Sequence, residues 1–553
     1  MIAPCIDMRI YFDKRLVALR SERTSWLTHW MDLSKFITPR RGRFLATQNQ
    51  GNRGASKTSN IIDSTATHAA QALAAGMQSG ITSPTRPWFH LTIENEDSES
   101  GPVHLWLDEC HRRMLAVLSD SNAYNALHTA YEELGVFGTA CIVVEEDDDD
   151  VIRVQTLTVG EYMLGNNKKG VADSLYREFT MTVGQVVERF GYDNCSVAVK
   201  SLYDHQGQDR EVIIGAAVEP NTGRFKHPLL NKKAFLSAYW EMGQRTDEFL
   251  ELKGYDELPF MAFRWRTLSN EPYGESPGMA CLGDVKALQK MQLKSAQAID
   301  KHVDPPMVAS VDMKNEAASL LPGGITYVPN QSQVGFKPAI EIQPNIQGIE
   351  AKIAECQKRI KTMFYEDLWL MLQNMEGVQP RNQMEIAERK QEKMLMLGPV
   401  LERLQYELLD PLVDRVFAIM QRAELLPVPP PELTSGKIDV EYVSTLSEAQ
   451  KAVDTGSVER MVAFIGNLAG ARPDALDNLN VDETIALYGD MISAPPKLLM
   501  DADQVAAMRQ QRAQQAQQQQ MMQQSMAATQ GAKNLADTDV GGGMNALQKM
   551  MGG

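Results

Sequence analysis

Two short stretches of the sequence come close to catalytic motifs. Residues 51–58, GNRGASKT, approach the loop that cradles phosphates with backbone N–H groups and a lysine. Ser56 replaces the second glycine of that pattern and no hydrophobic strand precedes it, so a polar surface loop is the favoured interpretation. Residues 274–278, GESPG, match the nucleophile elbow, in which the residue after the serine donates its N–H to an oxyanion. Pro277 has no N–H to donate, so Ser276 is predicted to cap a helix.

Two charged runs raise the question of metal binding. Residues 145–150, EEDDDD, carry several carboxylates but no glycine for the sharp turn of a calcium loop, and predicted strands flank them. We therefore predict a solvated hairpin turn. Residues 108–113, DECHRR, place Glu109 and Arg113 on one helical face as an ordinary ion pair, and His111 is expected to be solvated. These patterns predict a protein that is not an enzyme and that has no metal site and no cofactor.

The composition restricts the classes of partner. The 553 residues include 71 acidic and 55 basic side chains, which gives a formal net charge of -16 and disfavours tight, general binding of duplex DNA. The six cysteines show no CxxC spacing, so we expect reduced thiols without disulfides or structural zinc. The N-terminus lacks the apolar stretch of a signal peptide, and no segment reaches the roughly 18 apolar residues of a membrane span. We expect no membrane partner.

The first half of the chain is predicted to be α+β. Helices are expected over 7–37, from Asp63 or Ser64 through Met77, over 103–118 and over 122–135. Two β-branched runs surround the acidic turn in TACIVVEEDDDDVIRVQTLTVGEYML, and a strand followed by a helix is expected in SLYREFTMTVGQVVERFG. A chain of this length is expected to form several domains.

The second half is predicted to be mainly helical. A helix that begins near Pro277 should end at Val303, because Asp304 precedes two prolines. Short strands and turns follow, and then a second helix carries Ile349, Ile353, Cys356, Ile360 and Met363 on one face. The two helices therefore bracket a compact tip as an antiparallel pair.

A long apolar stripe comes next in the sequence. It consists of Leu397, Leu401, Leu404, Leu408, Leu412, Val416 and Met420. These side chains have helical spacing and are expected to be core, with kinks at Pro399 and Pro411. A further helical segment is predicted over roughly 447–492. The glutamine run near the C-terminus is expected to be helical only when packed in an assembly.

Four blocks of sequence follow one another between residues 59 and 420. They are SNIIDSTATHAAQALAAGMQSGITSPTRPWFHL, GEYMLGNNKKGVADSLYREFTMTVGQVVERFG, YGESPGMACLGDVKALQKM and RKQEKMLMLGPVLERLQYELLDPLVDRVFAIM. In this order and spacing they resemble the head-to-tail connector, or portal, proteins of short-tailed tailed phages. The resemblance implies a predominantly helical α+β portal-type fold with an α/β wing, an antiparallel helical stem, a small α/β clip and a helical crown.

The resemblance also implies a division of the chain into regions, of which the crown is assigned by position only. These are 1–85, the N-terminal helical part of the wing; 86–275, the α+β wing; 276–303, a stem helix; 304–345, the clip; 346–372, the returning stem helix; 373–383, a channel loop; 384–430, a long kinked wing helix; 431–495, a helical crown; and 496–553, a glutamine-rich helix with a disordered tail.

The implied function is that of a conduit for double-stranded DNA during packaging and ejection. The implied partners are eleven further copies in a ring, the DNA, the large terminase subunit, tail or adaptor proteins, and capsid and scaffolding proteins. The implied location is the unique capsid vertex of the virion, after assembly in the host cytoplasm. Two alternatives stay open: a nucleotide-driven packaging enzyme built around residues 51–58, and a helical scaffold protein without a DNA role.

Candidate site residues follow from this interpretation. The channel lining would be formed by Lys286, Lys290, Lys294, Asn374, Met375, Glu376, Gly377, Val378 and Gln379. Terminase or adaptor docking would involve Met313, Lys314, Asn315, Glu316 and Tyr327 in the clip. The three lysines share one helical face. Instead of facing a channel, they could pair with Glu350, Glu355 or Glu366 of the returning helix.

Overall fold

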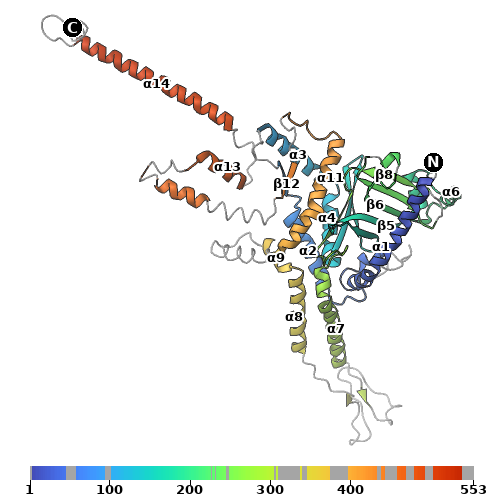
Figure 1. The fold of residues 1–553 in the computed structure, drawn as a ribbon. Helices are drawn as coiled ribbons and strands as arrows, with labels where there is room; N and C mark the ends of the chain where they lie inside the picture. The colour runs from blue at the N-terminus through green and yellow to red at the C-terminus, as the bar shows by residue number, and fades with distance from the viewer. Residues whose placement is uncertain are drawn as a thin grey trace, which may run out of the picture. The chain divides into compact units, whose positions relative to one another are not determined.

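The computed structural model describes residues 3–44, 58–93, 101–225, 227–230, 232–243, 248–303, 307–308, 337–338, 346–373, 397–431, 438–442, 458–468, 472, 479–491 and 502–537. The chain divides into two units. The first comprises Met1–Leu91, Cys110–Val428 and Val440–Leu446, and the second comprises Thr92–Glu109, Pro429–Asp439 and Ser447–Gly553. The fold is mixed α+β with helices predominant, as predicted (Figure 1).

A five-stranded antiparallel sheet forms much of the first unit. Its order is β4 (Tyr162–Asn166), β5 (Ala172–Thr182), β6 (Glu211–Pro220), β7 (Phe235–Glu241) and β8 (Glu251–Tyr255). Leu236, Ala238 and Trp240 alternate along β7 and bury against α1 (Ala3–Phe36), where Phe12 stacks on Trp240 at 5.7 Å between ring centroids. Tyr239 points to the opposite face. Successive side chains of a strand point to opposite faces, so β7 places apolar residues on both covered faces of the sheet.

The opposite face of that sheet is covered by two short helices. They are α5 (Val183–Phe190), which begins with a capping box at Thr182, and α6 (Val197–Asp204), which is capped by Ser196. Between β6 and β7 lies a short 3-10 helix, η4 (Pro228–Leu230).

A second antiparallel sheet has the order β3 (Val151–Leu157), β2 (Thr139–Asp147) and β9 (Phe260–Arg264). α4 (Ala123–Phe137) packs against β2 and β3. The chain leaves α4 through Gly138, whose φ of +77° lies in the left-handed region. A Cβ atom at Gly138 would lie only 2.2 Å from the carbonyl oxygen of Gly274, so this junction requires glycine.

The helix α2 (Thr65–Ile81) organises the centre of the first unit, where it packs against α4, α8 (Ile346–Met363) and α9 (Glu366–Gln373). A Cβ atom at Gly76 would lie 2.2 Å from Cγ of Trp369, so the lack of a side chain on α2 lets α9 approach. η1 (Pro39–Phe44) packs against α1, and α3 (Gly101–Asp120) precedes α4 in the chain. β1 (Phe89–Ile93) pairs with β12 (Ile438–Tyr442).

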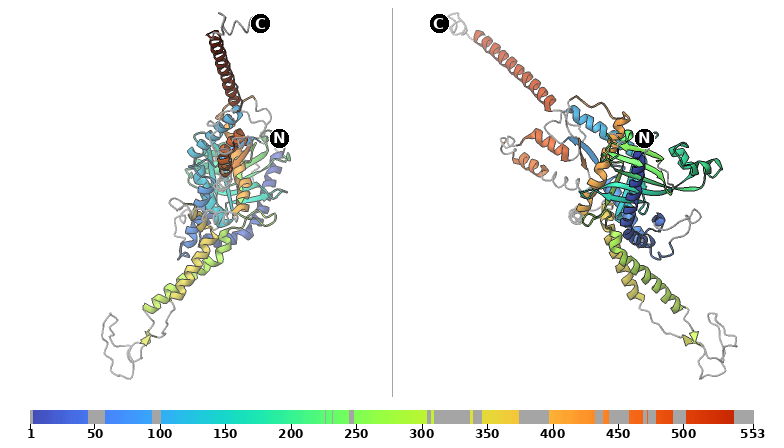
Figure 2. Two further views of the ribbon diagram at one scale, coloured as in Figure 1. Left: turned by 90° about the vertical axis from the view of Figure 1, so that its left-hand side faces the viewer. Right: turned by 45° about the vertical axis from the view of Figure 1, so that its right-hand side comes forward.

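Two long helices, α7 (Pro277–Val303) and α8, lie side by side in both views of Figure 2, and we refer to this pair as the stem. They are antiparallel, because Asp284 near the start of α7 bonds to Arg359 near the end of α8. The helix predicted from Pro277 to Val303 is confirmed at both ends. Beyond it, β10 (Met307–Val308) pairs with β11 (Lys337–Pro338), and the rest of the predicted clip lies outside the described residues.

The apolar stripe after residue 397 is core, as predicted. Leu397, Leu404, Leu408, Leu412, Val416 and Met420 are buried, and Leu401 is half-buried. Residues 397–404 are α-helical across Pro399, and η6 (Gln405–Leu409) is a π-helix that precedes α11 (Asp410–Arg422). Pro411 lies in the first turn of α11, so the interruption expected at this proline takes the form of a π-helical turn.

The C-terminal part of the chain is less regular than predicted. The predicted helical crown contains the strand β12, which the sequence pattern missed. The single helical segment expected over 447–492 is wrong, because residues 458–468 and α13 (Val481–Met491) are helical while residues 472, 479 and 480 are not. α14 (Ala502–Asp537) follows. No helix among the described residues is long and apolar enough to cross a membrane.

Candidate functional site

The stem begins with a serine that caps its first helix, as predicted. The Oγ atom of Ser276 accepts a hydrogen bond from the backbone N–H of Met279 at 3.0 Å and donates one to the carbonyl oxygen of Val136 at 2.7 Å. Ser276 is therefore the N-cap of α7, and Pro277 takes the first helical position, where a missing N–H costs nothing. The second bond fixes the base of α7 to the end of α4.

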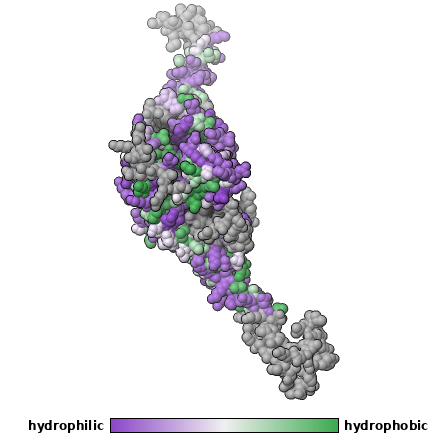
Figure 3. Space-filling view, turned by 90° about the vertical axis from the view of Figure 1, so that its right-hand side faces the viewer, coloured by the Kyte–Doolittle hydropathy of each residue, from purple (hydrophilic) through white to green (hydrophobic). Residues whose placement is uncertain are grey.

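The stem is basic within an acidic chain. α7 and α8 together carry eight lysine or arginine side chains against four acidic ones, which leaves a formal charge of +4. The whole chain has a formal charge of -16. On the face that Figure 3 shows, the described surface of the stem is mainly hydrophilic, with isolated apolar residues. The stem therefore presents a hydrophilic surface with a net positive charge.

The three predicted lysines lie in different environments. The Nζ atom of Lys286 is 2.7 Å from Oδ2 of Asp32 in α1 and 5.5 Å from the ring centroid of Phe36. Lys290 is exposed, and Lys294 is exposed and donates to Gln297 of its own helix at 3.0 Å. Lys286 thus joins the stem to the N-terminal helix, while Lys290 and Lys294 extend into solvent.

Two of the three acids considered as partners of these lysines pair with other residues. Glu355 lies 3.4 Å from Arg359, and Glu366 lies 3.2 Å from Lys361. Glu350 is exposed. The contact across the stem is instead made by Arg359 with Asp284 at 3.0 Å. The partner of Lys286 is in α1 and not in the returning helix.

One aspartate connects both stem helices to the start of α2. Its Oδ2 atom accepts hydrogen bonds from Gln292 of α7 at 3.1 Å and from Gln357 of α8 at 2.8 Å. The residue is Asp63, whose Oδ1 atom accepts from the N–H of Thr65 at 2.8 Å. The buried Gln289 completes the cluster, because its amide accepts from the N–H of Asp63 and donates to the carbonyl oxygen of Asp63. We call these four side chains, Asp63, Gln289, Gln292 and Gln357, the stem clamp.

The electrostatics of the stem clamp favour an ionised aspartate. Burial raises the pKa of Asp63, but the hydrogen bonds from Thr65, Gln357 and Gln292 outweigh this effect and hold the pKa below its ordinary value. Sequence reasoning identified Asp63 only as a possible helix cap and missed the three glutamines. The available signal was Gln289, a polar residue next to Val285 and Leu288 on the buried face of α7.

The stem returns to the centre of the unit through a sharp break. Tyr365 has a φ of +57°, which lies in the left-handed region, and its ring packs 6.0 Å from that of Trp265. α9 follows and ends at Gln373, so the first residue of the channel loop predicted at 373–383 is helical. The candidate channel residues Asn374, Met375, Glu376, Gly377, Val378 and Gln379 lie outside the described residues. So do the candidate docking residues Met313, Lys314, Asn315, Glu316 and Tyr327.

The acidic run forms the predicted hairpin turn, but its first two residues are not simply solvated. Oδ1 of Asp147 accepts hydrogen bonds from the N–H groups of Asp149 and Asp150 at 3.0 and 3.1 Å. Glu146 bonds to Arg422 of α11 at 2.6 Å, and Glu145 lies 3.3 Å from Arg189. Glu145 and Glu146, which belong to strand β2, therefore form ion pairs with the neighbouring helices α5 and α11. The turn residues 148–150 are exposed.

The expectation that His111 is solvated is wrong. His111 is 5% exposed, and its ring lies 5.1 Å from that of Phe89 and 4.7 Å from that of His90. Burial lowers the pKa of His111 to about 4, and His90 adds to this effect. His111 lies on the buried face of α3, next to Cys110, which is also buried.

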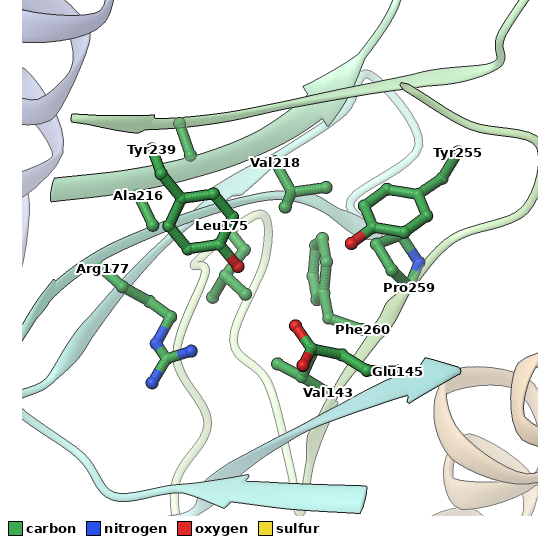
Figure 4. A pocket seen from close by; sticks show the side chains of 11 residues that line it. Val143, Glu145, Leu175, Arg177, Ala216, Val218, Tyr239, Tyr255, Pro259 and Phe260 are labelled. Carbon is green, nitrogen blue, oxygen red and sulfur yellow. The ribbon is translucent and has the colours of Figure 1, made fainter. Parts of the chain in front are cut away.

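A small cavity lies between the two sheets (Figure 4). Glu145, Arg177, Tyr239 and Tyr255 line it together with apolar side chains, and its volume is about 20 Å³. Such a volume holds about one water molecule, whereas small-molecule sites occupy hundreds of Å³. This cavity has no room for a nucleotide. Of the phosphate-loop candidate at 51–58, only Thr58 lies within the described residues.

Comparison with known proteins identifies the family. Residues 11–500 match the family described as "Bacteriophage head to tail connecting protein". The chain is 43% identical to the "Portal protein" of Salmonella phage epsilon15 over 529 residues, which are 95% of each chain. It is 43% identical to the "Probable portal protein" of Bordetella phage BPP-1 over 502 residues, 90% of this chain and 89% of that one.

Among solved structures, a chain in the neck of an empty gene transfer agent particle aligns with 77% of this chain and 88% of its own length, at 12% identity and a TM-score of 0.35. The family match spans most of the chain, and the two relatives are far above the identity at which homology is secure. The chain belongs to the family of bacteriophage head to tail connecting proteins, and its function is that of a phage head-to-tail connector.

Proposed function

We propose that the chain assembles into a closed ring of twelve subunits at the unique capsid vertex and that double-stranded DNA passes through the ring during packaging and ejection. The large terminase subunit docks during packaging, and tail or adaptor proteins replace it later. Capsid and scaffolding proteins surround the ring as it assembles in the host cytoplasm. The subunit has a structural role, and the force for packaging comes from the terminase.

The distribution of charge carries this proposal. Each phosphate that a protein neutralises releases counterions and adds affinity, so a channel lined strongly with basic residues would hold DNA in place. The chain has a net charge of -16 and concentrates a charge of +4 in the stem. A weakly basic stem within an acidic ring guides the DNA and lets it slide.

The three stem lysines have different environments, and we assign them different roles. Lys286 forms an ion pair with Asp32 and stabilises the stem within the subunit. Lys290 and Lys294 are exposed and form two rings of positive charge if their face lines the channel. In water each contact with a phosphate is worth only about 1 kcal/mol at 4 Å, and salt screens it beyond roughly 8 Å. Such rings slow the DNA without trapping it.

Electron microscopy of the purified protein tests the proposal directly. We expect closed rings with a central hole, and mass measurements should give twelve subunits. A monomer that persists across micromolar concentrations would overturn the ring. Open polymers would instead support the scaffold alternative. Turnover of ATP by the purified rings would support the enzyme alternative, and we expect none.

A further inference from the structure

One end of the five-stranded sheet collects basic residues. Residues 167–171 connect β4 to β5, and residues 221–234 connect β6 to β7. Both connections leave the sheet at the same end, because β5 and β6 are antiparallel with Leu175 opposite Val218. We call these two connections the basic end of the sheet. Their basic side chains are Lys168, Lys169, Arg224, Lys226, Lys232 and Lys233, and neither connection contains an acidic residue.

This composition differs from that of the rest of the chain. Nineteen residues of average composition would contain about two acidic and about two basic side chains. The connections at the opposite end of the sheet are residues 183–210 and 242–250, which contain six acidic and four basic side chains. The excess of positive charge is therefore confined to one end of the sheet.

The connection between β4 and β5 has an ordered turn. Oδ1 of Asn167 accepts hydrogen bonds from the backbone N–H groups of Lys169 at 2.8 Å and Val171 at 3.1 Å. The side chains of Lys168 and Lys169 are exposed at the tip of this turn. The backbone thus fixes the position of the two lysines, while their charged ends extend into solvent.

The connection between β6 and β7 is anchored in the core. Leu230 is 1% exposed, and Nδ2 of Asn221 donates to the carbonyl oxygens of Leu230 at 2.8 Å and Lys233 at 2.9 Å. The guanidinium of Arg224 lies 4.4 Å from the centroid of the Tyr11 ring in α1. Arg224 and Lys232 are both exposed, so this connection also presents its charges on an ordered backbone.

The acidic residues nearest the basic end already have partners. Asp256, which follows β8 at this end, lies 2.5 Å from Lys233. Glu257 pairs with two arginines of α11. Asp173, near the start of β5, accepts a hydrogen bond from the hydroxyl of Ser174 at 3.0 Å. Of the basic side chains, Lys233 is therefore committed to an acid within the chain, and the others supply a surplus of positive charge.

The density of this charge indicates the class of partner. Neighbouring strands are about 4.8 Å apart, so the two connections, which extend from β4 to β7, cover about 15 Å. Duplex DNA carries one negative charge per about 1.7 Å of its axis. An extended acidic peptide presents carboxylates to one side only at every second residue, or about every 6.8 Å. Six basic residues within about 15 Å match the duplex better than the peptide.

We propose that the basic end of the sheet binds the phosphate backbone of double-stranded DNA, at a contact separate from the stem. The stem helices pack against α1, α2 and α4, whereas the basic end belongs to the five-stranded sheet. Lysines on turns contact phosphates and not base edges, so this binding is independent of sequence and sensitive to salt. The inference rests on the proposed function, which brings duplex DNA to the ring.

Binding of a circular duplex tests this contact in the full-length protein. A relaxed circular plasmid has no end that can enter a preformed ring, so its retention on a protein-binding filter reports contacts outside the channel. The variant combines Lys168→Gln, Lys169→Gln and Lys232→Gln. The matched control combines Lys290→Gln, Lys294→Gln and Lys358→Gln, which removes three exposed charges from the stem.

The two variants should differ in affinity for the plasmid and in its dependence on salt. We expect the variant of the basic end to lose at least about tenfold in affinity at low salt, and its slope of log affinity against log salt to fall by up to about 3, because each phosphate contact contributes about 0.9. The stem control should lose less than about twofold. The variant with Lys168→Gln and Lys169→Gln alone should lie between the wild type and the triple variant.

Several outcomes would overturn the inference. Wild-type rings that do not retain the plasmid at low salt would show that the basic end is only a solvated surface. Equal losses in the variant and the stem control would indicate a general attraction without a defined site. Tighter binding of poly-glutamate than of the duplex, at equal concentrations of charge, would identify an acidic protein as the partner.

The mass of the particle is measured in parallel for every variant. Rings that are lost only in the variant of the basic end would make this surface a contact between subunits and would contradict the inference. Wild-type protein without rings would instead contradict the proposed function. Plasmid binding by such unassembled protein that is lost in the same variant would still support the DNA contact, so the two failures are distinguishable.

Discussion

Replacing Asp63 by alanine tests whether the stem clamp holds the stem. The change removes the acceptor of three hydrogen bonds, from Thr65, Gln292 and Gln357. Hydrogen bonds to a charged group contribute about 1.5 to 3 kcal/mol each when buried. Asp63 is only half-buried, so we expect a combined loss of about 2 to 3 kcal/mol in the free energy of local opening.

Local hydrogen exchange is the suitable measurement, because a chain with two units does not unfold in one step. A loss of about 2 to 3 kcal/mol corresponds to roughly 30- to 150-fold faster exchange in the segments that open together. We expect this increase in α7, α8 and the first turn of α2. The control is Asp300→Ala, which removes an exposed carboxylate from the same stem.

The pH dependence of exchange provides a second comparison. The pKa of Asp63 is held below its ordinary value, so its contribution is complete above that ordinary value and is lost as the pH falls through the lowered pKa. After correction for the intrinsic pH dependence of amide exchange, the free energy of local opening of the stem should therefore fall in acid more steeply in the wild type than in the alanine variant. Equal exchange rates in Asp63→Ala and Asp300→Ala at neutral pH would refute the stem clamp.

Three further predictions follow from the same structure. Lys290→Glu with Lys294→Glu should leave the rings intact but reduce DNA packaging or retention in a salt-dependent way; assembly defects without any DNA phenotype would contradict the proposed role. Glu133→Gln should remove a pH dependence: burial raises the pKa of Glu133 to about 8, so the wild type loses stability as the pH rises from the ordinary value of 4.5 towards 8. Thermal melts at pH 6 and 8 should then differ less in the variant, and identical pH slopes would contradict this account. Replacing Asp147–Asp150 by asparagine should change stability by less than about 0.5 kcal/mol, because an asparagine at the first position keeps the acceptor of the turn. A large fall in melting temperature, or a calcium requirement lost with the change, would show that the turn is more than a solvated hairpin.

The sequence by itself determined the features that depend on neighbouring residues. Ser276 and Pro277 define the start of α7, and the two prolines after Asp304 define its end, because capping and the restrictions of proline act within one turn of the chain. The hairpin turn at 148–150 is equally local. The buried stripe after Leu397 could be predicted because helical spacing alone places these side chains on one face.

The tertiary structure decided which side chains from distant parts of the sequence meet. Asp63 and Gln357 are separated by 294 positions, and Lys286 and Asp32 by 254, so no local pattern specifies these pairs. His111 is similar, because a polar residue on a helix is predicted to face solvent until a neighbouring strand covers it. Helix periodicity gives the face of each helix, but the partner of that face depends on how the whole chain packs, and this is why the stem clamp was not predicted.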